Sequence, residues 1–331
     1  MAHPFLSIVI PTKNRVATVV RTIEALTEQR APAGGMELIV VDDGSSDSTL
    51  ATLRMLAARG PLPLSALRGD GRGPASARNA GVAAAAGDVV LFLGDDTRPA
   101  EASLLERHAE LHRLRPQSGY AVLGRVTWDD AQSVTPFMHW LECGGPQFAY
   151  HRLARGAVDA SSYFYTAHVS LKRELFERAG GFDEQFPGAA VEDLELGVRL
   201  ETLGIELDYQ PDLLVLHDHA TSLARSLART EAIGRSAALY NQLHPERPHP
   251  GIKPAHGLRW RLLRIAAPAL AAGRRGVLPE DAVRPAWRML HLAAYERGYR
   301  RAETERGGAG RASGPHASRA SSSRRPTSPS S

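Results

Sequence analysis

Short apolar runs alternate with amphipathic stretches through the first hundred residues. Four apolar-rich runs predict strands, at residues 6–10, 37–41, 62–67 and 89–93. Three stretches between these runs have apolar residues at helical spacing and predict helices, with start signals at Asn14, Ser46–Asp47 and Pro74. Because strands and helices alternate, we expect an α/β fold class, with a parallel sheet and right-handed crossovers.

The rest of the chain predicts mixed α and β structure followed by helices. Further strands are expected at 120–126, 163–171 and 213–216. Further helices are expected at 174–179, at 192–203 and from Thr97–Pro99 onward. After Thr221 the sequence predicts helices, and near the end it has too few apolar residues to order itself. We therefore expect three regions: an α/β domain over 1–220, a helical extension over 221–302 and a disordered basic Ser/Arg/Gly-rich tail over 303–331.

Composition narrows the classes of protein to which the chain can belong. A hydrophobic content of 43% over 331 residues is enough for a sizeable core. Cys143 is the single cysteine, which excludes an internal disulfide framework and fits a reducing cytoplasm. The net charge of +4 falls to about −1 without the five arginines of residues 306–331. We therefore expect no nucleic-acid partner.

The apolar pattern also bears on membrane contact. No run of about 18 apolar residues is present, so we expect no membrane-spanning helix. Strand-like sequence from Leu6 leaves no room for a signal peptide, and we expect a cytoplasmic protein. Residues 258–265 combine Arg and Trp with apolar positions. They predict either a helix packed on the α/β domain or a peripheral contact with the inner face of the cell membrane.

Carboxylates follow two of the predicted strands. Asp42–Asp43 end the second strand and Asp95–Asp96 end the fourth, at the edge where sheets of this kind bind ligands. A carboxylate there can accept a hydrogen bond from a nucleotide base, and two adjacent carboxylates suit Mg²⁺ or Mn²⁺. Turns and helix caps would explain the same residues, and both interpretations stay open on this pattern alone.

Three later features are weaker when each is taken alone. Asp193 lies in the acidic first turn of a predicted helix, where it could act as a general base or simply face the helix dipole. His217 and His219 share one face of the last predicted strand and could ligate a metal or pack. Arg78, in an Ala-rich helix, could reach a phosphate or lie on a solvated surface.

Some familiar motifs are absent from the sequence. No Gly-x-Gly-x-x-Gly follows the first strand, and there is no Gly-Lys-Ser/Thr phosphate loop. Gly-x-Ser-x-Gly is missing as well. These absences disfavour a nicotinamide Rossmann enzyme and an α/β-hydrolase.

Six segments, taken in order, resemble the inverting family 2 glycosyltransferases of the nucleotide-diphospho-sugar transferase superfamily. They are SIVIPTKNR at 7–15, VVDDGSSD at 40–47, ARNAG at 77–81, FLGDD at 92–96, GGFDE at 180–184 and EDLEL at 192–196. The similarity covers about residues 5–220. It implies a GT-A type nucleotide-binding sheet sandwiched by helices, and transfer of a sugar to an acceptor hydroxyl with inversion.

The resemblance implies a role for each candidate residue on the donor side. Six residues are implied to contact the donor nucleotide sugar: Pro11, Thr12, Asn14, Asp43, Arg78 and Asp95. Of these, Asp43 would hold the base, Arg78 would lie near the nucleotide, and Asp95 would lie near the ribose or the donor sugar. The donor is expected to be a UDP-, GDP- or dTDP-sugar.

The resemblance also implies a metal site and a catalytic base. Asp96 would bind Mn²⁺ or Mg²⁺ that bridges the donor diphosphate, with His217 completing the site, and Asp193 would deprotonate the acceptor. Two residues depart from the family pattern. Gly94 replaces the first acid of an Asp-x-Asp loop, which implies a weaker metal site, and His168 implies altered acceptor contacts.

The expected function is metal-dependent glycosyl transfer onto a saccharide or lipid-linked acceptor, in cell-envelope, exopolysaccharide or glycolipid synthesis. Two alternatives are a nucleotide-sugar-binding protein without transfer activity and a sugar nucleotidyltransferase. Retention of Asp43, Asp96 and Asp193 argues against the first. The lack of a glycine-rich phosphate loop near the N-terminus argues against the second.

Overall fold

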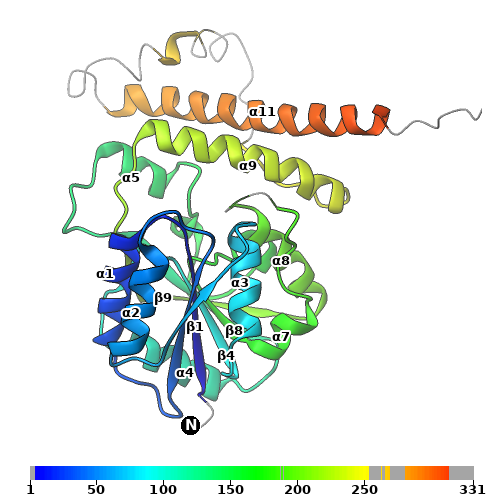
Figure 1. Ribbon diagram of the computed structural model, residues 1–331. Helices are drawn as coiled ribbons and strands as arrows, with labels where there is room; N and C mark the ends of the chain where they lie inside the picture. The colour runs from blue at the N-terminus through cyan, green and yellow to red at the C-terminus, as the bar shows by residue number, and fades with distance from the viewer. Residues whose placement is uncertain are drawn as a thin grey trace, which may run out of the picture.

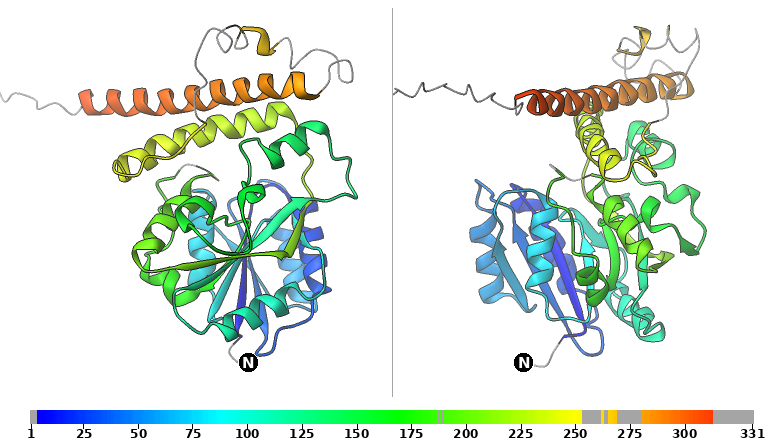
Figure 2. Two further views of the ribbon diagram at one scale, coloured as in Figure 1. Left: turned by 180° about the vertical axis from the view of Figure 1, so that it is seen from behind. Right: turned by 90° about the vertical axis from the view of Figure 1, so that its right-hand side faces the viewer.

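A mixed sheet with helices on both faces forms the centre of the molecule (Figures 1 and 2). This computed structural model describes residues 4–186, 188, 190–252, 262, 265–268 and 280–312. Eight strands lie in the order β3-β2-β1-β4-β8-β6-β9-β5, and β7 pairs with β9. The α/β class and the sandwich of helices around a central sheet are confirmed.

The first half of the sheet is parallel, as the alternating pattern predicts. Its strands are β1 (Leu6–Thr12), β2 (Met36–Asp42), β3 (Leu64–Arg68) and β4 (Val89–Leu93). The crossover helices are α1 (Val16–Thr27), α2 (Thr49–Arg59) and α3 (Pro74–Ala83). All five residues of β4 are buried, as expected for a strand that is covered on both faces.

Two of the three predicted helix starts need correction. Arg15, not Asn14, precedes α1, and the side chain of Asn14 accepts a hydrogen bond from the Ser46 N–H instead, at 2.8 Å. Ser48 precedes α2, although Asp47 does accept a hydrogen bond from the N–H of Thr49 at 3.0 Å. The start at Pro74 is confirmed.

The second half of the sheet turns antiparallel at β8. It contains β8 (His168–Lys172), β6 (Tyr120–Trp128), β9 (Glu206–His217), β5 (Thr97–Pro99) and β7 (Gly156–Val158). Strand β8 runs antiparallel to both β4 and β6, whereas β6 and β9 are parallel. The helix expected from Thr97–Pro99 is therefore wrong, because these residues pair with β9 as β5.

The remaining helices of the α/β domain surround this second half. They are α4 (Leu104–Leu114), α5 (Pro136–Cys143), the 3₁₀ turn η1 (Tyr150–Arg152), α6 (Ala160–Tyr163), α7 (Arg173–Arg178) and α8 (Glu192–Thr202). The strand expected over 163–171 is shorter, because its first residue ends α6 and pairing begins at His168. The strand expected over 213–216 begins earlier, at Glu206.

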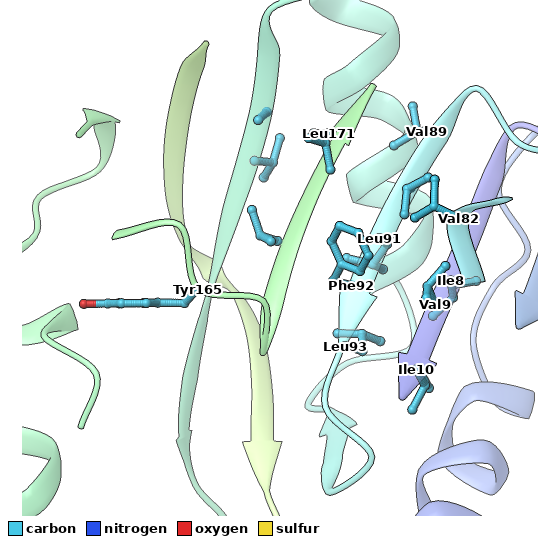
Figure 3. Packing of buried hydrophobic residues seen from close by; sticks show 14 of the residues in the cluster. Ile8, Val9, Ile10, Val82, Val89, Leu91, Phe92, Leu93, Tyr165 and Leu171 are labelled. Carbon is cyan, nitrogen blue, oxygen red and sulfur yellow. The ribbon is translucent and has the colours of Figure 1, made fainter. Parts of the chain in front are cut away.

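The main core lies between the parallel strands and the helices on both faces. Figure 3 shows Ile8, Val9 and Ile10 of β1 beside Leu91 and Phe92 of β4, and all five are at most 1% exposed. Helix α3 approaches β1 closely at Gly81, where an added Cβ would lie 2.4 Å from the Cγ1 of Val9. Larger residues at this position would push α3 away from the sheet.

Two long helices lie across the end of the sheet opposite the N-terminus (Figures 1 and 2). They are α9 (Leu223–Leu243) and α11 (Glu280–Ala312). Gly234 and Gly298 allow their close contact, because an added Cβ would lie 2.1 Å from the Tyr295 carbonyl oxygen or 1.9 Å from that of Glu231. Helix α11 continues past residue 302, the predicted end of the helical extension.

Some sequence expectations fall where the structure describes little. Of segment 258–265, only Leu262 and Ile265 are described, both helical and both exposed. The tail beyond residue 312 lies outside the described residues. Among the described helices, none combines the length and the apolar character that crossing a membrane requires.

Candidate functional site

The carboxyl ends of β1, β2 and β4 bring three of the predicted donor residues together. The Thr12 hydroxyl, at the end of β1, donates a hydrogen bond of 2.7 Å to the carboxylate of Asp95. The Thr12 carbonyl accepts one of 2.8 Å from the N–H of Asp43. The first two carboxylate motifs therefore meet at one edge of the sheet, although 83 positions separate Thr12 from Asp95.

Asp43 is held in place from two sides. Its carboxylate accepts hydrogen bonds from the N–H of Gly73, at 3.1 and 3.3 Å, just before α3 begins. The ammonium group of Lys13 lies 3.5 Å away. Gly44 follows with φ of 74°, a left-handed conformation that glycine adopts at no steric cost. This turn directs Asp43 to the edge of the sheet, with only 5% of the residue exposed.

Asn14 joins the loop after β1 to the loop after β2. Its backbone N–H donates to the Ser45 hydroxyl at 2.7 Å, and its side-chain oxygen accepts from the Ser46 N–H at 2.8 Å. Asn14 has a positive φ of 52°, which asparagine tolerates better than most residues. The predicted segment from Pro11 to Asn14 is thus fixed against the loop that contains Asp43.

Arg15 connects both carboxylates of the loop after β4. One guanidinium nitrogen, Nη1, donates to Asp95 at 2.6 Å and to Asp96 at 2.8 Å, and Nη2 lies 3.0 Å from Nδ1 of His219. Burial and the neighbouring Asp96 raise the pKa of Asp95, against the opposing effect of Arg15. A single cation therefore lies where two buried carboxylates would otherwise repel each other.

His217 and Asp96 form the other half of this cluster. Nε2 of His217 lies 3.2 Å from Oδ2 of Asp96, and Nδ1 of His219 lies 4.0 Å from the same oxygen. The His217 ring stacks on Trp128 with 5.1 Å between centroids. Burial acts to raise the pKa of Asp96, but the contacts with His217 and Arg15 outweigh it, and the pKa lies below its ordinary value.

The donor set at Asp96 can be tested for its fit to a divalent ion. Among the described residues, no group of three or more His, Cys, Asp or Glu side chains is placed to hold a metal. The pair of Asp96 and His217 does offer one carboxylate oxygen and one imidazole nitrogen, both of which suit Mn²⁺. Such ions often take one or two protein ligands and complete their shell with phosphate oxygens and water. The two residues therefore fit an ion that is shared with a diphosphate.

Asp193 is the second residue of α8, a helix that follows a strained residue. Val191 precedes the helix with φ of 78°, a left-handed conformation that is rare for a β-branched residue. Burial and the adjacent Glu192 raise the pKa of Asp193 to about 7, although Arg78 opposes this shift. The Leu194 N–H donates to its carboxylate at 2.9 Å. A carboxyl group with a pKa near neutrality suits proton transfer.

Backbone contacts place Asp193 close to the loop that carries Asp95. The Thr166 N–H lies near enough to the Asp193 carboxylate to oppose the rise of its pKa, as a hydrogen bond would. The next residue, Ala167, accepts one from the N–H of Gly94 through its carbonyl, at 3.3 Å. The third predicted carboxylate motif therefore joins the other two, with residues 166–167 between them.

Arg78 lies on the Asp193 side of this edge. Its Nη1 donates to Glu192 at 2.9 Å, and its guanidinium lies over the ring of Phe182 at 5.5 Å from the centroid. Arg78 is only 8% exposed, and its buried Nε has no hydrogen-bond partner. A buried donor without a partner is costly, and the ion pair with Glu192 offsets part of that cost.

Aromatic side chains form a wall near Asp193. Tyr150 and Tyr165 lie 5.5 Å apart between ring centroids, and Phe148 lies 5.1 Å from Tyr165. Burial raises the pKa of Tyr150, and the nearby charge of Asp193 raises it further. The buried Tyr150 hydroxyl has no hydrogen-bond partner. Phe148 also lines a small pocket with Trp128, Glu142, Gln147 and His217.

His168 does not face a ligand, so the inference about altered acceptor contacts is wrong. The residue is fully buried, and its Nε2 lies 2.9 Å from Nε2 of His108 on α4. Two further hydrogen bonds of 2.9 Å join His108 and His112 to the hydroxyl of Ser170. We call His108, His112, His168 and Ser170 the histidine cluster. It lies among α4, β8 and β6 and is part of the core.

Sequence reasoning did not single out Arg15, Val191 or Tyr150. Arg15 stood in the matched segment 7–15, where its charge after a strand end could have been noted. Val191 carries no signal in its residue type, because valine disfavours the conformation that it adopts. Tyr150 lies in a 3₁₀ turn far along the chain from Asp193, and only the fold brings the two near each other.

The fold and the site can be compared with known proteins. A validoxylamine A glucosyltransferase of Streptomyces hygroscopicus subsp. jinggangensis is 33% identical over 228 residues, covering 62% of this chain and 53% of that protein. A pre-mycofactocin glycosyltransferase of Mycobacterium tuberculosis is 29% identical over 267 residues, covering 75% and 50%. The chain thus spans about half the length of these curated relatives.

Solved structures share the fold at lower identity. The mannosyltransferase PcManGT from Pyrobaculum calidifontis, in complex with GDP-Man and Mn²⁺, has a TM-score of 0.62 at 21% identity, covering 91% of this chain and 88% of that one. S. aureus TarS 1-349 in complex with UDP-GlcNAc has a TM-score of 0.51 at 17% identity, covering 92% of each chain. The model of the family described as "Glycosyl transferase family 2" matches residues 7–178, which is more than half of the sequence. This chain, with its GT-A fold, therefore belongs to that family.

Proposed function

We propose that this chain transfers a sugar from a nucleotide-diphosphate sugar to an acceptor hydroxyl, with inversion at the anomeric carbon. The observation that carries the proposal is Asp193, whose pKa is raised to about 7 by burial and by Glu192 at the start of α8. A carboxylate that is poised near neutrality beside a nucleotide-binding edge is suited to remove a proton from an attacking hydroxyl. A single displacement with such a base inverts the configuration.

The donor nucleotide would lie along the ends of β1 and β2. Asp43 would accept a hydrogen bond from the base, and Pro11, Thr12 and Asn14 would surround the nucleoside. Asp95 would lie near the ribose or the donor sugar. Related folds that contain GDP-Man or UDP-GlcNAc support a nucleotide-sugar donor. The positive charge of Arg78 beside Glu192 and Asp193 supports a role for this residue toward the negatively charged part of the donor.

Asp96 and His217 would hold a divalent cation, Mn²⁺ or Mg²⁺. When bound, the ion would neutralise charge that develops on the departing diphosphate. The Mn²⁺ in the PcManGT structure supports this choice of cofactor. The chain's own contribution is to hold the carboxylate and the imidazole 3.2 Å apart and to fix the imidazole plane against Trp128.

The acceptor would enter beside the aromatic wall of Phe148, Tyr150 and Tyr165. Aromatic faces pack against the apolar faces of polyhydroxylated rings, which favours an acceptor of this kind. We propose a saccharide or lipid-linked acceptor of envelope synthesis. The relatives named for validoxylamine A and pre-mycofactocin favour a second candidate, a small polar molecule.

Asp193→Asn tests the proposed base, because asparagine keeps the shape and cannot take the proton. With nucleotide sugars and candidate acceptors, we expect transfer to fall about 10²- to 10⁴-fold, while donor binding in a thermal-shift assay stays near that of wild type. Asp159→Asn makes the same chemical change at an exposed carboxylate before α6 and is the matched control. Transfer by Asp193→Asn at the wild-type rate would remove Asp193 from this role.

Product analysis separates the proposal from its two alternatives. A nucleotide-sugar-binding protein without transfer activity would bind the donor and release no nucleoside diphosphate. A sugar nucleotidyltransferase would release pyrophosphate from a nucleoside triphosphate and a sugar phosphate. Inverting transfer predicts nucleoside diphosphate release together with a glycoside of opposite anomeric configuration, which NMR of the product would detect.

A further inference from the structure

The guanidinium of Arg15 lies where a cation would bridge the two carboxylates after β4. Its Nη1 donates to Asp95 at 2.6 Å and to Asp96 at 2.8 Å, and Asp96 is also the proposed metal ligand. Both carboxylates are nearly buried: Asp95 is 7% exposed and Asp96 is 9% exposed. Of the described positively charged side chains, Arg15 alone forms an ion pair with both.

We propose that Arg15 and the divalent cation compete for Asp96, so that Arg15 leaves this carboxylate when the ion binds. This inference rests on the proposed function for the metal site. The two cations exclude each other because Nη1 already lies within hydrogen-bond distance of the Asp96 oxygen that faces His217, Oδ2. An ion on that oxygen would lie next to a like charge, which is unfavourable at short range.

Arg15 is placed so that its side chain can leave without loss of the fold. It precedes α1, and its carbonyl, not its side chain, accepts the first helical hydrogen bonds from Thr18 and Val19 at 3.0 Å each. Its side chain is 31% exposed, whereas the carboxylates that it contacts are buried. The guanidinium can therefore turn toward solvent, or toward a donor phosphate, while α1 stays in place.

The competition predicts how ion and donor affinities are linked. Without donor, Arg15 lowers the affinity for the ion because the ion must displace the charge-assisted hydrogen bond from Arg15 to Asp96. A bound diphosphate offers Arg15 an alternative anionic partner and thereby removes this penalty. Nucleoside diphosphate and ion should then each strengthen binding of the other by one common factor, and loss of the guanidinium should reduce that factor.

Mn²⁺ binding measured by electron paramagnetic resonance tests the competition without any catalytic assay. Free Mn²⁺ is titrated against the full chain, as wild type and as Arg15→Gln, with no nucleotide present. We expect Arg15→Gln to bind Mn²⁺ about tenfold tighter or more, the size of effect expected from one lost charge-assisted hydrogen bond. Adding Asp96→Asn to this variant should abolish the gain. Arg15→Lys, which keeps one charge but cannot form the same fork, should lie between the two.

Arg21→Gln is the matched control. Its guanidinium is also on the α1 side of the site and pairs with Asp218 at 2.6 Å, without contact to Asp95 or Asp96. Its Mn²⁺ affinity should equal that of wild type. Equal or weaker Mn²⁺ binding by Arg15→Gln, or no Mn²⁺ binding by any variant, would overturn the competition. Glycosyl transfer in the same preparations would show separately whether the proposed function holds.

Discussion

Lowering the pH from 7 to 5 should destabilise this protein strongly through the histidine cluster. The hydrogen bonds assign one proton to each ring. His168 Nδ1 must donate to the Arg125 carbonyl, at 3.3 Å, so its Nε2 accepts from His108. His108 Nδ1 then accepts from the Ser170 hydroxyl, which in turn accepts from His112 Nε2. Each ring is neutral, and a proton added at Nε2 of His168 would set two N–H groups against each other.

The size of the loss in the free energy of unfolding follows from how far the pKa values of these histidines lie below the ordinary value of 6.5. Burial lowers the pKa of His168 to about 4 and that of His112 to about 3, and it places the pKa of His108 well below 6.5. In the unfolded chain these rings take up protons below pH 6.5, while in the fold they stay neutral. The cluster's stability is therefore complete above pH 6.5 and falls between 6.5 and about 4. At pH 5 His168 and His112 each lower the free energy of unfolding by about 2 kcal/mol, and His108 adds to this loss.

Urea denaturation between pH 7 and pH 5 measures this loss. Near pH 5.5 His168 and His112 together should give a slope of about 2.5 kcal/mol per pH unit in the free energy of unfolding, and His108 adds to this slope. His112→Gln keeps a side-chain N–H donor and removes one titrating ring, so the slope should fall by about 1.4 kcal/mol per pH unit. His139→Gln removes an exposed histidine of α5 as the control. A slope that is the same in wild type and His112→Gln would refute the reasoning.

Three further predictions concern Gly124, the Asp193 carboxyl group and the divalent cation. Gly124→Ala should lower the free energy of unfolding, measured in urea, by about 1–3 kcal/mol. The reason is that the added Cβ would lie 2.1 Å from Cε1 of His168. An unchanged free energy of unfolding would mean that the His168 ring can move. Transfer should fall about tenfold per pH unit below the Asp193 pKa of about 7, and a flat pH–rate profile between 5.5 and 7 would contradict the assigned base. EDTA should abolish nucleoside diphosphate release and Mn²⁺ should restore it, whereas Asp96→Asn should stay slow at any Mn²⁺ concentration that saturates wild type.

Local pattern was sufficient for the parallel half of the sheet. Strands such as β4 are uniformly apolar because helices cover both faces, and the run can be recognised without knowing its neighbours. Strand β5 could not be recognised in this way, since Thr97–Pro99 is extended only through pairing with β9, more than a hundred residues later. The start of β9 did have a signal, because Leu207 and Tyr209 are buried and alternate with partly exposed neighbours.

The candidate site, like the fold, has a part that the sequence could predict and a part that it could not. Carboxylates at strand ends could be predicted to meet, because the carboxyl ends of parallel strands share one edge of the sheet. The partners of those carboxylates could not be predicted, since Arg15 reaches Asp95 across 80 positions of the chain. The left-handed conformation of Val191 was equally out of reach, as it opposes the preference of valine and is imposed by the surrounding structure.

The balance of charge at this edge limits how a donor can bind. Three side-chain cations pair with four carboxylates here: Lys13 with Asp43, Arg15 with both Asp95 and Asp96, and Arg78 with Glu192 beside Asp193. A diphosphate adds negative charge to a site where carboxylates already outnumber these cations. Without further positive charge, it would raise the pKa of Asp193 above about 7 and keep the proposed base protonated. On the proposed function, efficient transfer at neutral pH would therefore need extra positive charge to enter the site together with the donor.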